Sequence, residues 1–216
     1  MRRTLFLIAL FIVCAPLAFA QQSRPDDYPR FEWFAGYSAL GDANNKDDGR
    51  ILTFYGSNTG LETSLARNLS RRWGIKGDFS AHFGTNRGPG SFGQPFTQTS
   101  PINGDYQFEH RLFNFLIGPE FKARNRSRVT PLAYTLVGVG VSRGEVKITF
   151  PTSTGNVKVS DTGVALALGG GLDVKAANRL GLRFTADYNP VYAGGNSIAP
   201  RGWRDHVRLS LGFVIH

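Results

Sequence analysis

The chain has 216 residues, of which 41% are hydrophobic and 19% are charged, and its formal net charge at pH 7 is +9. This length suits one domain of ordinary size, and a single cysteine excludes an internal disulfide framework. The Lys and Arg residues are scattered among short polar segments rather than gathered in one run, so we expect no nucleic-acid partner.

The first 20 residues have the pattern of an export signal. Arg2 and Arg3 are followed by an apolar run from Leu5 to Leu17 and then by Ala18-Phe19-Ala20, with small residues where a signal peptidase reads. The run is shorter than the roughly 20 apolar residues of a spanning helix, although an uncleaved anchor is the alternative. We predict a signal peptide over 1–20, a linker over 21–30 and one folded domain over 31–216. Cys14, the only cysteine, lies within the signal.

Apolar and polar residues then alternate with a period of two, which is the pattern of a β-strand with one apolar face. In the segment from Trp73 to Gly84, for example, Ile75 and Phe79 share one face, while Lys76 and Asp78 share the other. We predict eight such strands, each of about the 9–11 residues that cross a bilayer at a tilt. They cover 31–40, 60–69, 73–84, 108–122, 129–142, 162–174, 180–188 and 207–215.

The connections between these strands alternate in length. Short turns at 70–72, 123–128 and 175–178 alternate with long connections at 41–59, 85–107, 143–161 and 189–204, which carry most of the Gly, Asn, Asp and Pro residues. An even number of strands with short turns at one end and long loops at the other is typical of an outer-membrane barrel. We therefore predict an all-β fold: an eight-stranded antiparallel up-and-down transmembrane barrel in the outer membrane.

Ten charged residues fall on the polar phase of these strands and are expected inside the barrel. Eight strands leave an interior that side chains just fill, so these charges must pair with one another. We predict a structural network rather than an ion path, which is the alternative. Its members are Glu32, Glu62, Lys76, Asp78, Glu120, Lys122, Asp173, Arg183, Asp187 and Arg208.

Two further groups are assigned to the membrane boundaries. Trp33, Trp73, Tyr188 and Trp203 stand at predicted strand ends, where amphipathic rings favour the bilayer interface. The short turns are basic and hold no acidic residue, so we expect them to face the periplasm and contact anionic lipid headgroups, or merely to keep the chain soluble before insertion. These residues are Arg71, Arg72, Arg124, Arg126 and Arg128.

The combined pattern resembles the small bacterial outer-membrane β-barrels of the OmpA and OmpX type, and the broad family called outer membrane protein beta-barrel domain. The resemblance covers about 31–216 and is carried by Phe31-Glu32-Trp33-Phe34-Ala35-Gly36-Tyr37-Ser38, Gly77-Asp78-Phe79-Ser80, Gly169-Gly170-Gly171-Leu172-Asp173-Val174, Leu182-Arg183-Phe184 and Asp187-Tyr188. It implies insertion by the barrel-assembly machinery of a Gram-negative envelope. Such families end on a lipid-facing aromatic residue, whereas here His216 is out of phase after Ile215.

No motif in the sequence carries chemistry. Asp78, Ser80 and His82 share one strand face, but neighbours two apart on a strand are roughly 7 Å apart, too far for direct proton transfer. We expect no enzyme activity, cofactor or metal, and a monomeric barrel that acts in envelope integrity or in surface interaction through a ligand of its outer loops. A narrow porin-like channel and a soluble lipocalin-like barrel are the alternatives.

Overall fold

The structure, a computed structural model, describes residues 28–43, 58–92, 102–125, 127–149, 154–194 and 201–216. The predicted signal peptide and most of the predicted linker lie outside these residues. All described regular elements are strands: β1 (Phe31–Asp42), β2 (Thr59–Asn68), β3 (Trp73–Phe92), β4 (Ile102–Lys122), β5 (Val129–Thr149), β6 (Thr154–Lys175), β7 (Leu180–Tyr188), β8 (Val191–Ala193), β9 (Gly202–Arg204) and β10 (His206–Ile215). Among the described residues, no helix is long and apolar enough to cross a membrane.

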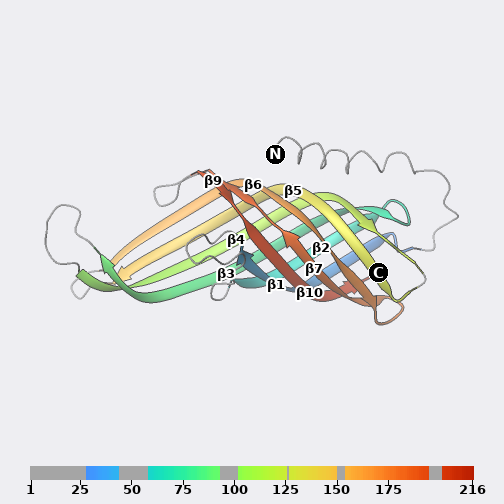
Figure 1. Cartoon of the computed structure of the whole chain (residues 1–216), viewed down its shortest axis with the longest axis horizontal. Coiled ribbons are helices and arrows are strands. Elements are labelled where there is room, and N and C mark those ends of the chain that lie inside the picture. The colour runs from blue at the N-terminus through green and yellow to red at the C-terminus, as the bar shows by residue number, and fades with distance from the viewer. Residues whose placement is uncertain (1–27, 44–57, 93–101, 126, 150–153, 195–200) are drawn as a thin grey trace.

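Eight of the strands form one closed antiparallel ring, as predicted. Each pairs with the next in chain order from β1 to β7, β10 pairs with β7, and β1 pairs with β10 to close the ring. The closing register runs from Trp33 opposite Ile215 to Asp42 opposite His206. Figure 1 shows the ring with its axis nearly horizontal and the C-terminus at one end. That end, which also carries the short connections at 69–72, 123–125 with 127–128, and 176–179, is here called the turn end.

Side chains alternate between the inside and the outside of the ring as the sequence pattern predicts. In β10, His206, Arg208 and Ser210 are buried, whereas Leu211 and Phe213 are more than half exposed. The exposed large side chains of the ring are almost all apolar, and the buried ones are largely charged or polar. A closed sheet with this polarity suits a lipid exterior, because all its backbone groups are paired between strands.

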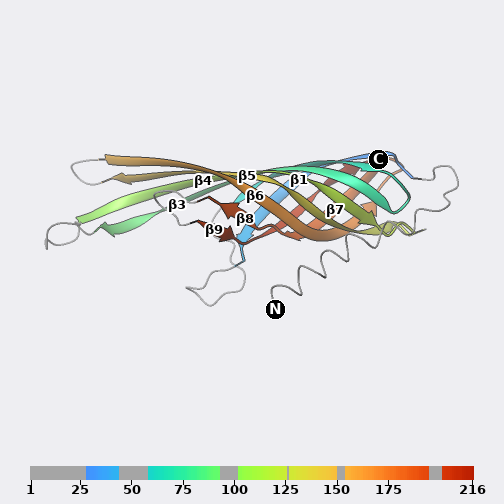
Figure 2. The ribbon, with the colours of Figure 1, turned by 90° about the horizontal axis from the view of Figure 1, so that it is seen from above.

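Two predicted loops are instead continuations of strands. The segments 85–107 and 143–161 were expected to be irregular, but β3 runs to Phe92, β4 starts at Ile102, β5 runs to Thr149 and β6 starts at Thr154. The four strands pass the rest of the ring as an antiparallel sheet in the order β3-β4-β5-β6, which Figures 1 and 2 show extending away from the C-terminal end. Residues 84–92, 102–111, 143–149 and 154–160 are called the outer arm below.

The loop prediction was wrong because the polarity of the alternation reverses where the arm begins. On β4 and β5 the last outward apolar residues of the ring are Phe113 and Val141, in a row with Thr162 of β6. The next outward row has Phe83 on β3, followed by Arg111, Arg143 and Ser160. Beyond it the outward positions are mostly charged or polar and the inward ones are mostly apolar, so the apolar phase that marks the ring strands does not continue. The outward charges include Glu109, Glu145, Lys147 and Lys158, and the inward apolar residues include Phe108, Val146, Ile148, Val157 and Val159.

The predicted loop 189–204 also contains structure. β8 and β9 form a small hairpin that joins the ring through the pairing of Ala165 with Val191. Trp203 was expected to open the last strand of the barrel, but it lies in β9 and packs on Tyr192 of β8 with ring centroids 5.2 Å apart. The hairpin therefore supplies this aromatic pair, and the barrel strand begins at His206.

Candidate functional site

Near the turn end, charged side chains from four strands meet inside the ring around Glu32 of β1. Its carboxylate accepts hydrogen bonds from Lys122, the last residue of β4, and from Arg183 of β7 at 2.8 Å. Arg183 also donates to its cross-strand partner Asp173 at 2.6 and 2.7 Å, and Lys122 lies 2.7 Å from Glu120. We call Glu32, Glu120, Lys122, Asp173 and Arg183 the turn-end cluster.

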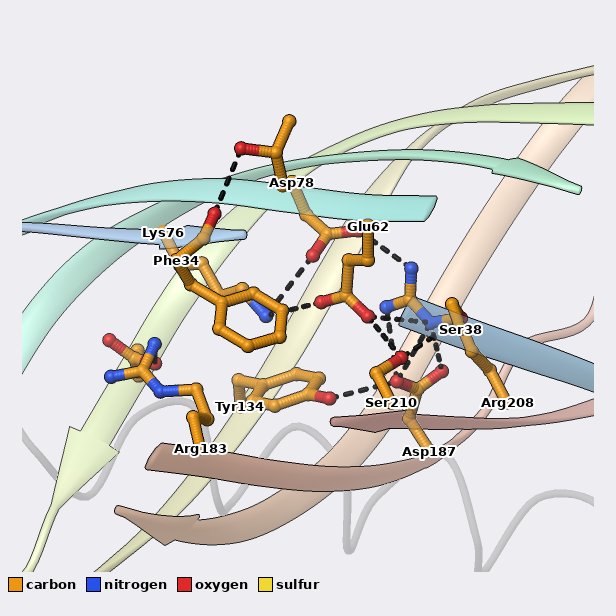
Figure 3. A network of polar contacts seen from close by, with 12 residues as sticks. Phe34, Ser38, Glu62, Lys76, Asp78, Tyr134, Arg183, Asp187, Arg208 and Ser210 are labelled. Carbon is orange, nitrogen blue, oxygen red and sulfur yellow. Dashed lines mark hydrogen bonds and ion pairs between the residues drawn. The ribbon is translucent and has the colours of Figure 1, made fainter. Parts of the chain in front are cut away.

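A second group, the central cluster, lies further along the barrel and centres on Arg208 of β10. Its guanidinium lies 2.8 Å from Asp78 and 3.0 Å from Asp187, its cross-strand partner, and 3.7 Å from Glu62. Lys76 lies 3.1 Å from Asp78 and 3.4 Å from Glu62. Figure 3 shows Arg208 among the carboxylates of three different strands. The two clusters thus contain all ten charges assigned to the interior from the sequence.

Neutral side chains complete the central cluster, and the sequence reading did not single them out. The Tyr134 hydroxyl donates to Asp187 at 2.8 Å, and the Lys76 ammonium lies 4.1 Å from the centroid of the same ring. The Ser210 hydroxyl contacts Glu62 and lies 2.9 Å from that of Ser38. The signal was present, because Tyr134 lies on the inward phase of β5, opposite to Val137 and Val139.

The other side of the interior is apolar rather than charged. Leu112, Leu116, Leu132 and Leu136 of β4 and β5 are at most 5% exposed and form one cluster with other buried apolar residues. Buried charges and buried leucines thus fill the ring side by side. Removing one partner of a buried ion pair is costly, and packed apolar side chains exclude water. Both parts of the interior therefore favour the closed ring.

One nucleophile–base contact exists inside the ring, but it lacks the other parts of a hydrolytic site. His82 Nε2 lies 2.9 Å from the hydroxyl of Ser38, not that of Ser80, and both residues are at most 1% exposed. His82 Nδ1 has no hydrogen-bond partner, so no carboxylate orients the ring. In the part of the chain that the structure describes, no group of three or more His, Cys, Asp or Glu residues could hold a metal ion.

A cavity of about 490 Å³ lies at the opposite end of the barrel, where the ring gives way to the outer arm. One wall comes from β3 to β6, including Phe108, Leu112 and Ser142, and the other comes from the β8–β9 hairpin with Tyr192 and Trp203. Sequence reasoning did not find this site, because the wall with Tyr192 and Trp203 comes from the segment 189–204, which was read as a loop.

The predicted boundary residues occupy different positions. Trp33 is half exposed on β1 near the turn end and donates from Nε1 to Thr63, while Trp73 packs on Phe121 with centroids 5.0 Å apart. Tyr188 ends β7 toward the arm, where its hydroxyl contacts Asp205. Together with Trp203 on the hairpin, they lie toward the two ends of the ring.

Of the basic turn residues, Arg71, Arg72 and Arg128 are exposed, and Arg126 lies outside the described residues. Arg124 differs, because its guanidinium contacts Glu32 and donates to the carbonyl of Arg71, with only 13% of the side chain exposed. The expectation that Arg124 faces lipid headgroups is therefore wrong: the buried Glu32 carboxylate attracts it into the mouth of the ring.

Comparison with known proteins gave likenesses to solved structures. The search of family models and that of curated protein sequences found no match. The chain is similar to Ail, the attachment invasion locus protein of Yersinia pestis, at 17% identity and TM-score 0.47, over 86% of this chain and 97% of that one. It is also similar to Neisserial surface protein A, at 13% identity and TM-score 0.47, over 87% and 97%. A third likeness is to the outer membrane protease OmpT from Escherichia coli, at 10% identity and TM-score 0.47, over 91% and 99%.

At these identities the likeness concerns the architecture alone. The chain's own geometry is a closed antiparallel ring of eight strands, with an apolar outside and charged side chains paired within. In water, a barrel of this polarity would expose a large contiguous apolar surface. In a bilayer the same surface faces lipid, and bacterial barrels of this polarity lie in the outer membrane. The chain therefore has the architecture of the small integral outer-membrane β-barrels.

Proposed function

We propose that this chain is a non-enzymatic outer-membrane protein that binds an extended polypeptide segment at the cell surface through its outer arm. In outer-membrane barrels the short turns face the periplasm and the long connections face the medium. The arm would then stand outside the cell. The observation that carries the proposal is the continuation of four paired strands beyond the ring as a sheet with an open edge on β6.

The open edge of β6 is defined by its hydrogen bonds. The backbone N–H of Leu166 points away from β5 and donates to the carbonyl of Pro190 at 3.0 Å. The register with β5 runs without interruption, so every second residue directs its backbone groups to the same side. In the arm these residues are Asn156, Lys158 and Ser160, and no described strand pairs with them there. Such an edge is a template for the addition of another strand.

The filled interior supports surface binding over conduction. Lys76, Arg208 and Tyr134 close the ring at the level of the central cluster, and Arg183 and Lys122 close it near the turn end; all are at most 3% exposed. We infer that the purified barrel gives no single-channel steps in a planar bilayer at neutral pH. Discrete conductance steps that disappear when the barrel is unfolded would favour the channel instead.

The edge can be tested with a library of displayed extended peptides, selected on the folded barrel. Ser160→Pro removes one backbone N–H at the open edge of β6 and leaves the hydrogen bonds between β5 and β6 in place. Ser160→Ala keeps that N–H and is the matched control. Selected peptides should bind the native protein and the Ala variant about equally and lose most of their affinity for the Pro variant. Equal binding to the Pro variant, or the absence of any enriched peptide, would refute the proposal.

The export, membrane insertion and oligomeric state of the chain are also proposals. We propose that residues 1–20 are cleaved after Ala20 during export, that the barrel-assembly machinery inserts the chain, and that it stays monomeric. The tripartite pattern of the first 20 residues supports cleavage. N-terminal sequencing of envelope protein should then begin at Gln21, and a sequence beginning at Met1 would contradict it.

A further inference from the structure

The cavity at the arm end has the size and the mixed lining of a small-molecule site. Its volume of about 490 Å³ lies within the range of ligand pockets, which are also common at the mouths of β-barrels. Its lining includes the buried Leu112 and Val191, and polar side chains from several strands and from the β8–β9 hairpin. It is separate from the open edge of β6 on which strand addition depends.

Two glycines in adjacent strands line this cavity, and one of them lets the β8–β9 hairpin approach its wall. Gly140 of β5 and Gly163 of β6 lie directly opposite each other in the ladder, and both line the cavity. A Cβ atom on Gly140 would approach Cγ1 of Val191 to 2.8 Å and Asn114 Oδ1 to 3.0 Å. The neighbouring hairpin therefore packs at this level only because position 140 has no side chain.

Aromatic rings lie on both walls of the cavity. Tyr192 and Trp203 pack together at an interplanar angle of 62°, and Trp203 remains 52% exposed. Phe108 lines the opposite wall. Aromatic faces of this kind pack well against the C–H groups of a flat or puckered ring, and the Trp indole keeps one N–H donor.

The polar lining combines donors and acceptors with little net charge. Asp161 and Asp205 supply carboxylates, Arg204 supplies a guanidinium, and Asn58 and Asn86 supply both a donor and an acceptor each. The Arg204 Nη2 atom is buried without a hydrogen-bond partner. Carboxylates and guanidinium together disfavour a strongly charged ligand of either sign, and this many polar groups disfavour an acyl chain.

From this combination we propose that the cavity binds an uncharged saccharide. A sugar hydroxyl both donates and accepts hydrogen bonds, which suits the mixed polar lining, while the apolar face of the sugar ring suits Trp203. The ligand would enter from the side of the arm, where the barrel faces the medium. On β6 the cavity is lined by Asp161 and Gly163, whereas the open edge runs over Asn156, Lys158 and Ser160.

The test uses the folded barrel in lauryldimethylamine oxide, because sugar-based detergents would compete for the site. An array of neutral oligosaccharides, with sulfated and carboxylated ones beside them, identifies the ligand, and titration calorimetry with the best neutral sugar gives the Kd. Trp203→Ala removes the aromatic face, and Ser142→Phe fills the cavity. Trp33→Ala is the matched control, since Trp33 is 51% exposed near the turn end.

We expect a neutral saccharide to bind the native barrel and to lose about tenfold or more in affinity with Trp203→Ala and Ser142→Phe. The Trp33→Ala variant should bind it as the native protein does. All variants should keep the heat-modifiable gel mobility of a folded barrel, so that a loss reports the site rather than unfolding. Binding of anionic glycans alone, binding of no sugar, or an unchanged Kd in Trp203→Ala would overturn the proposal.

Discussion

The outer arm continues four of the eight strands of the ring, yet the outward side chains of the two regions have opposite polarity. Along β5 every odd-numbered side chain points outward from Val129 to Thr149, but these side chains are mostly apolar up to Val141 and charged or polar from Arg143 onward. The strand backbone determines which way a side chain points, and the surrounding medium, lipid or water, determines whether that side chain is apolar or polar. We therefore place the outer boundary of the bilayer between the row of Val141 and the row of Arg143.

The two regions should differ most in their response to the loss of an arginine. Arg208→Met leaves Asp78 and Asp187 as buried carboxylates without their main partner. The free energy of unfolding, measured by urea titration in lipid vesicles, should therefore decrease by about 3–5 kcal/mol. Arg143→Met in the arm removes an exposed charge and should change it by less than about 0.5 kcal/mol. Similar losses in both variants would mean that the interior is hydrated.

A charge added to the outer surface should destabilise the ring and leave the stability of the arm almost unchanged. Phe79→Arg or Leu182→Arg places a cation against lipid near the middle of the ring and should destabilise the folded barrel by about 2–4 kcal/mol. Gln107→Arg on the outward face of the arm should have almost no effect, since that face already carries charges. An equal loss at Gln107 would place the arm within the bilayer.

The turn end provides a smaller and salt-dependent effect. Arg72→Gln and Arg128→Gln should each weaken refolding into phosphatidylglycerol vesicles by about 1 kcal/mol at low salt and have little effect at high salt. Arg124→Gln should instead impair folding in neutral and anionic lipid alike, because its partner is the buried Glu32. If all three variants responded to salt in the same way, the inward contact of Arg124 would be refuted.

The smallest expected effect concerns pH in the arm. The side-chain hydrogen bond from Asn156 to Glu145, helped by Lys158 and Lys147, lowers the pKa of the Glu145 carboxyl below its ordinary value. Its contribution to arm stability is therefore complete at neutral pH and is lost only as the pH falls through that lowered pKa. Carboxyl NMR titration should show this, and Asn156→Ala should raise the pKa; an ordinary pKa in the native protein would contradict it.

Periodicity predicted the ring but not everything around it. The alternation along β3, β7 and β10 fixed their inward residues, because one apolar face against lipid needs a strict period of two. It could not assign partners: Asp173 opposite Arg183 and Asp187 opposite Arg208 follow from strand register, which the hydropathy pattern leaves open.

The outer arm and the cavity were missed for a different reason. Pro89, Gly90 and Gly155 within the arm are turn formers by composition, yet they stand in paired strands. Tertiary pairing with the neighbouring strands outweighs these local preferences. The cavity could not be predicted either, because the β8–β9 hairpin that forms one wall has only three residues in each strand.

The boundary between ring and arm can be tested most directly with spin labels along β5. The only cysteine, Cys14, lies within the predicted signal, so single cysteines at Val137, Val139, Val141, Arg143, Glu145 and Lys147 can be labelled without background in a processed barrel. In bilayers, collision with oxygen should dominate at the first three positions and collision with a water-soluble nickel chelate at the last three. A gradual change with no reversal between Val141 and Arg143, or oxygen-dominated collision throughout, would contradict a lipid-facing ring that continues into a water-exposed arm.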